Sequence, residues 1–259
     1  MPGPQLAALL SVSLLAILAL TGRLRFVAEE FPTRRRRLAA LLLLAATLAT
    51  CVFYPAAAGS DLANIDPADI SFPALFAGHA VLAGFLALWW AFGRRESPAR
   101  FLLLERASFD DLKRGLWIGA MGWAITILGT IAIALPFAGS GAAAEPAEIP
   151  PFMHWLAAMP LARKLIVIAV AMTVEEAFFR AFLQTRIGWI PSSLLFALSH
   201  ASYGLPMLMV AVLIISLIIG RALRQTGRLL PCIVAHGAFD AIQLLVIIPF
   251  AVRMIESGQ

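Results

Sequence analysis

The chain has 259 residues, of which 61% are hydrophobic and 14% charged, and its formal net charge is +5. Soluble globular domains are nearer half apolar and a quarter charged, so this composition excludes that class and indicates a membrane protein. In a membrane protein, excess arginine and lysine reports topology and contact with anionic lipid, so we expect membrane lipid and not nucleic acid as a partner.

Apolar stretches long enough to cross a hydrocarbon core of about 30 Å recur along the whole chain. We therefore predict an all-α, polytopic transmembrane helix bundle with about eight spans. These cover residues 5–22, 38–58, 72–92, 115–137, 161–183, 187–200, 205–223 and 229–254. The first is expected to be retained, because its positive charges follow the apolar run instead of preceding it as in a signal peptide. The sixth is short and carries Pro191 near its start, which also fits a tilted or half-buried helix.

Basic residues gather in alternate connections between the predicted spans. Clusters occur at residues 23–37, 94–114 and 221–228, whereas the intervening connections are acidic or neutral apart from two basic residues that begin the fifth span. The positive-inside rule then places both termini outside the cytoplasm. We divide the chain into four amino-terminal spans with a linker (residues 1–160) and the remaining spans (residues 161–259), and expect one integrated bundle.

Ionisable side chains inside spans are rare because each costs about 2.5–3.5 kcal/mol at the helix centre. Most of those in this chain come from the last four predicted spans. They are His79, Glu175, Glu176, Arg180, His200, His236 and Asp240. Glu176 and Arg180 are four residues apart and can pair on one helix face, while Glu175 is rotated about 100° away.

Two further pairs have the same four-residue spacing. Phe196 and His200 share a face in "FALSH", and His236 shares a face with Asp240 in "HGAFD". Counting about 1.5 Å per residue puts Glu175, His200 and His236 about 10–13 Å from the same side of the membrane. We therefore expect these three groups to converge on a pocket toward the cytoplasmic side. His79 has no partner motif and is predicted to be a packing residue.

The converging set has the groups required for peptide hydrolysis without a serine or cysteine nucleophile. Glu175 could act as general base on a water held by His200, with His236 and Asp240 stabilising the developing oxyanion. Glu175, His200 and His236 could instead bind a catalytic zinc with an open position for water. The residues alone do not decide between glutamate-activated and metal-activated water, so the cofactor is unknown at this stage.

The three motifs together resemble the CAAX-protease and bacteriocin-processing (CPBP, or Abi) family of intramembrane proteases. "EEAFFR" fits EExxxR, "FALSH" fits FxxxH, and "HGAFD" fits HxxxN or HxxxD. The resemblance covers roughly residues 161–249 and implies an endopeptidase that cuts a membrane-associated protein or peptide in a bacterial plasma membrane. It implies that Glu175 and His200 activate water and that Glu176 supports Arg180. Asp240 departs from the asparagine that the prenyl-protein enzymes generally carry.

Two other classes of function use similar residues. A non-catalytic immunity or scaffold protein could bind a partner through the polar cluster. An ion-coupled transporter also needs buried glutamate, histidine and arginine. Confinement of the cluster to one half of the chain, without an internal repeat, counts against transport.

Overall fold

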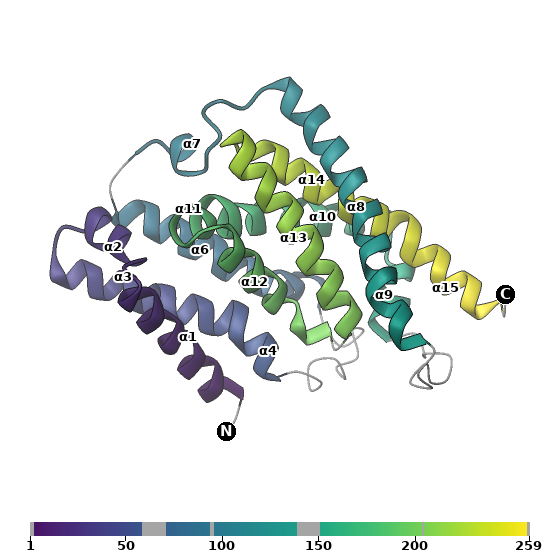
Figure 1. The fold of residues 1–259 in the computed structure, drawn as a ribbon, viewed down its shortest axis with the longest axis horizontal. Helices are drawn as coiled ribbons and strands as arrows, with labels where there is room; N and C mark the ends of the chain where they lie inside the picture. The colour runs from purple at the N-terminus through teal and green to yellow at the C-terminus, as the bar shows by residue number, and fades with distance from the viewer. Residues whose placement is uncertain (1–2, 59–70, 94–95, 139–150, 204, 258–259) are drawn as a thin grey trace.

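The computed structural model describes residues 3–58, 71–93, 96–138, 151–203 and 205–257, and every regular element in these ranges is helical (Figure 1). The predicted all-α bundle is therefore confirmed. Most of the linker predicted before residue 160 lies outside the described residues.

The amino-terminal part runs through an antiparallel set of long helices joined by short ones. α3 continues into α4 through a π-helical turn, and α6 follows a 3₁₀ turn. The elements are α1 (Gly3–Leu20), α2 (Arg25–Glu30), α3 (Arg34–Leu48), η1 (Ala49–Phe53), α4 (Tyr54–Ala58), η3 (Phe72–Phe76), α6 (Ala77–Phe92), α7 (Pro98–Phe101) and α8 (Phe109–Ala138).

The carboxyl-terminal part contains two more long helices that pass through π-helical segments. The elements are α9 (Pro151–Ala158), α10 (Leu161–Glu176), η4 (Ala177–Gln184), α11 (Thr185–Ile187), α12 (Trp189–Ser199), η5 (Ala201–Tyr203), α13 (Pro206–Thr226), α14 (Leu230–Ile242), η6 (Gln243–Ile247) and α15 (Ile248–Glu256). In Figure 1, α14 and α15 form one yellow-green rod crossed by α8, while α1, α3 and α4 lie on the opposite side of the bundle.

The number of membrane spans is lower than the eight predicted. Among the described residues, six helices are long and apolar enough to cross a membrane, or seven if α9 and the rod from Leu161 to Ile187, which meet at 112°, count as one bent span. Of the two interpretations of the sixth span, the structure supports a tilted or half-buried helix and not a full crossing, because α12 has only 11 residues and reaches about 16 Å. Gly188, at φ +99°, starts α12 in a new direction.

Glycines on α8 allow it to lie very close to α13 and α14. A β-carbon added at Gly119 would stand 2.6 Å from the carbonyl oxygen of Ala235 and 2.7 Å from the β-carbon of Ala238. Gly115, one turn earlier, faces Val234 in the same way. Small residues four apart let membrane helices pack backbone against backbone, where van der Waals contact replaces the hydrophobic effect as the driving force.

An aromatic cluster joins α6 to η4. The ring of Phe182 lies 4.8 Å from the rings of both Phe85 and Trp89, in edge-to-face geometry. The indole nitrogen of Trp89 donates to Glu30, 2.6 Å away, and Glu30 also pairs with Arg186 at 2.8 Å. The cluster fixes α6 beside the rod formed by α10 and η4.

The close approach of α8 and α14 predicts the effect of one added methyl group. Gly119→Ala is expected to lower the midpoint of thermal unfolding in detergent micelles, because the overlap costs about 1–3 kcal/mol. Gly84→Ala is the matched control, since a β-carbon at Gly84 has no neighbour within 4 Å. Its midpoint should stay level or rise, because alanine favours helix over glycine by about 1 kcal/mol. Equal shifts in both variants would contradict the assigned contact.

Candidate active site

The candidate site gathers at the point where α10 changes to a π-helical winding. Glu175 and Glu176 are the last two residues of α10, and η4 follows directly. A π-helical segment contains an extra residue per turn, which changes the directions of neighbouring side chains, and such segments are frequent at functional sites. Here the two adjacent carboxylates contact different partners.

Glu176 and Arg180 form the pair that their spacing predicts. Arg180 Nε donates to Glu176 Oε2 at 3.1 Å, and neither side chain is exposed. The arginine continues to α13, where Nη2 lies 3.0 Å from the hydroxyl oxygen of Ser216. Its guanidinium also covers the ring of Phe196 in α12, 4.9 Å from the ring centre. The pair therefore links three helices inside the bundle.

His236 contacts the second carboxylate oxygen of Glu176. Its Nδ1 lies 3.0 Å from Glu176 Oε1, and its Nε2 lies 3.4 Å from Asp240 Oδ2. The sequence predicted the pairing with Asp240 but assigned Glu176 to Arg180 alone. Gly237 makes the contact with α10 close, because a side chain there would overlap the sulfur of Met172.

Glu175 contacts a residue that the sequence analysis placed elsewhere. His79 Nε2 of α6 lies 2.9 Å from Glu175 Oε1, so the prediction that His79 is only a packing residue is wrong. The signal in the sequence was the histidine itself, because an ionisable residue inside a membrane span costs free energy unless it has a polar partner. Its partner Glu175 lies 96 residues away in sequence, so the residues around His79 contain no pairing motif. A local motif cannot reveal such a contact.

The other oxygen of Glu175 faces His200. Glu175 Oε2 stands 3.9 Å from His200 Nε2 and has no hydrogen-bond partner among the described residues. His200 Nδ1 lies 2.9 Å from the carbonyl oxygen of Phe196, which can only accept, so Nδ1 carries the proton. In a neutral ring, Nε2 is then an acceptor that faces Glu175.

The ring of Phe196 lies beside both histidines. Its centre is 4.7 Å from that of His200 and 5.7 Å from that of His236. Phe196 and His200 thus share a helix face, as their spacing in the sequence predicted. The ring of Phe196 lies between His200, which faces Glu175, and His236, which contacts Glu176.

Burial divides these residues into two groups. Glu176 and Arg180 have fully buried side chains, whereas those of Glu175, His200 and Asp240 are 13%, 18% and 23% exposed. The first group supports the structure from inside. The second is partly exposed, although within it the Oε2 atom of Glu175 is buried.

Equal depth does not explain how these groups meet. Counted from the helix ends observed at Ile187, Trp189 and Leu230, Glu175, His200 and His236 lie about 18, 16 and 9 Å along their helices. These distances along the helices differ from one another, and the predicted common depth of 10–13 Å in the membrane stays a prediction. The crossing of α14 over α10, allowed by Gly237, produces the contact with His236.

The proposed zinc ligands do not surround one point. Among the described residues, no group of three or more His, Cys, Asp or Glu side chains could hold a metal ion. Glu175 and His200 face one another, but the nearest polar partners of His236 are Glu176 and Asp240. The residues as arranged do not fit a three-ligand zinc site.

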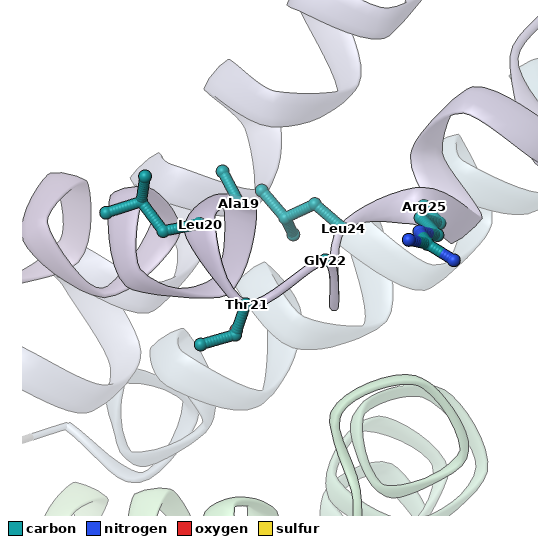
Figure 2. Close-up of a pocket in the computed structure, with 6 residues that line it drawn as sticks. All are labelled: Ala19, Leu20, Thr21, Gly22, Leu24 and Arg25. Carbon is teal, nitrogen blue, oxygen red and sulfur yellow. The ribbon is translucent and has the colours of Figure 1, made fainter.

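Two surface hollows lie away from the candidate site formed by Glu175, His200 and His236. One of about 550 Å³ is at the turn between α1 and α2, lined by the six residues in Figure 2. Another of about 830 Å³ lies at the ends of α11, α12 and α13, with Arg23, Trp189 and Arg224 on its wall. Neither wall contains a histidine or carboxylate, so neither hollow offers a general base.

Comparison with known families agrees with the motif-based resemblance. The family model described as type II CAAX prenyl endopeptidase Rce1-like matches residues 157–242, about a third of the chain. The resemblance to the CAAX-protease family is thereby confirmed, and it indicates an intramembrane protease of the CAAX-protease type in general. No curated protein and no solved structure matches the chain.

The buried pair predicts a large loss of stability when only one partner is removed. Arg180→Ala leaves the fully buried Glu176 without its arginine and should cost about 3–5 kcal/mol. The measurement is the midpoint of thermal unfolding in micelles. Arg221→Ala, which changes an exposed arginine of α13, should leave the midpoint unchanged. An Arg180→Ala protein as stable as the wild type would contradict the supporting role of this pair.

Proposed function

We propose that the chain is an intramembrane endopeptidase that hydrolyses a peptide bond of a membrane-associated protein or peptide with water activated by Glu175 and His200. The observation that carries the proposal is the 3.9 Å separation of Glu175 Oε2 and His200 Nε2. It is too long for a direct hydrogen bond, and one water oxygen can contact both atoms.

Such a water would be oriented for attack. It would donate one hydrogen to Glu175 Oε2 and the other to His200 Nε2, because both atoms are acceptors. Its lone pairs would then face the scissile carbonyl carbon. Glu175 takes the proton as the carbon–oxygen bond forms and later gives it to the leaving amine as the carbon–nitrogen bond breaks.

The His236 side of the site would stabilise the oxyanion. Both ring nitrogens of His236 face carboxylates, Glu176 at 3.0 Å and Asp240 at 3.4 Å, which favours a ring protonated on both. Because Arg180 already balances Glu176, the protonated ring and Asp240 form an ion pair, and the dipole of that pair would act on the developing negative charge in a site of low dielectric. Asp240 would thus orient His236, and an ionised aspartate has no hydrogen to donate to the oxyanion itself.

Substrate class and orientation remain part of the proposal. A peptide ending in a prenylated CAAX sequence is the first probe to try, because the matching family model is described as a prenyl endopeptidase. With an even number of crossings, as in the count of six, the basic connections would place both termini outside the cytoplasm and the site toward the cytoplasmic side of a plasma membrane.

The mechanism predicts the behaviour of two charge-neutral variants. Glu175→Gln should cleave an internally quenched prenylated CAAX peptide about 10²–10⁴-fold more slowly, because the amide cannot accept the proton from water. Glu256→Gln, at an exposed position of α15, should retain the wild-type rate. Equal unfolding midpoints would show that the loss is chemical.

Other results would support the other classes of function. If Glu175→Gln cleaves as fast as the wild type, the protease mechanism is wrong. If neither protein cleaves the probe, comparison of the membrane proteomes of cells carrying each variant searches for another substrate. A phenotype that survives Glu175→Gln would support an immunity or scaffold protein, and ion flux that depends on Glu175 without proteolysis would support a transporter.

The glutamate mechanism also predicts insensitivity to metal removal. Purified protein should contain far less than one zinc per chain and should keep its cleavage rate after dialysis against a chelator, because Glu175 and His200 hold the water without an ion. Mass spectrometry for metals and the peptide assay measure the two quantities. Stoichiometric zinc, together with chelator-sensitive activity restored by zinc alone, would support the metal-activated alternative.

A further inference from the structure

His79 brings a polar group to the site from a helix outside the matched family segment. It lies in α6, whereas the family model covers residues 157–242. Its 2.9 Å contact with Glu175 is the only side-chain hydrogen bond that either residue makes among the described residues. No other residue of α6 carries a titratable side chain.

We propose that His79 is a positioning residue that fixes the carboxylate of Glu175, an inference that rests on the proposed function. The last torsion of a glutamate side chain is broad and easily turned. A hydrogen bond to Oε1 removes that freedom and directs Oε2 toward His200. Without it, the carboxylate can rotate away from the water that the two residues share.

The donor must be the histidine. A carboxylate that acts as a general base is ionised and can only accept, so Nε2 of His79 carries the hydrogen. Nδ1 of the same ring is buried and has no partner among the described residues. Glu175 is therefore the polar contact that offsets the cost of placing this ring in the membrane.

Packing alone does not account for a histidine at this position. Its ring centre lies 6.1 Å from that of Phe76, a contact that a leucine or phenylalanine could also make. The rest of α6 is held by Phe85 and Trp89, which pack against Phe182 of η4. These contacts place His79 opposite Glu175 without any requirement for an imidazole.

The test compares three substitutions at His79 in the full-length protein, with the quenched prenylated peptide as the probe. His79→Leu should lower kcat about 10- to 100-fold, because small displacements of a reacting group cost that much. KM should change less than about twofold, since His79 contacts Glu175 and not the substrate. His79→Gln should restore most of kcat, because its amide nitrogen reaches nearly as far as Nε2. His79→Asn, which is shorter, should not.

The controls separate this inference from the proposed function. His154→Leu changes an exposed histidine of α9 that pairs with Glu256, and it should keep the wild-type kcat and KM. If Glu175→Gln abolishes cleavage but folded His79→Leu keeps the wild-type kcat, the positioning role is wrong and the protease survives. If the His79→Gln and His79→Asn variants have the same kcat and differ from the wild type only in unfolding midpoint, the role of His79 is structural. The inference is then also wrong. If cleavage does not depend on Glu175, the proposed function itself fails.

Discussion

A single buried carboxylate holds the centre of this bundle together. Glu176 accepts hydrogen bonds from Arg180 in the next turn and from His236 in α14, and it is not exposed. Arg180 continues to Ser216 in α13 and covers Phe196 in α12. A charge inside a membrane protein is tolerated only where it is paired, so these helices are fixed relative to α10 by the need to satisfy one charge network.

That constraint leaves Glu175, the adjacent residue, available for the chemistry that we propose. Because it points to a different side of the helix, Glu175 is excluded from the network and faces His79 and His200 instead. The two adjacent glutamates thus differ in their contacts. Glu176 stabilises the helices, whereas one oxygen of Glu175 has no hydrogen-bond partner in the part of the chain that the structure describes. Pre-organised groups around a partly accessible carboxylate are what general-base hydrolysis needs.

Close helix contacts make this arrangement possible. Gly119 lets α8 approach α14, and Gly237 lets α14 approach α10 until His236 reaches Glu176. On the other side, Phe85 and Trp89 hold α6 against η4 and so bring His79 to Glu175. The candidate site therefore depends on both halves of the chain, although the family match covers only residues 157–242.

The sequence by itself determined the all-α membrane class, the pairing of Glu176 with Arg180 and the shared faces of the "FALSH" and "HGAFD" motifs, because these follow from apolar length and from helical periodicity. It left open whether the sixth predicted span crosses the membrane, and the structure decided that α12, which starts only after Gly188, is too short to cross. Only the tertiary structure decided that His236 reaches Glu176 and that His79 reaches Glu175. Contacts between helices distant in sequence depend on crossing geometry and side-chain direction, and residue spacing within one helix contains neither.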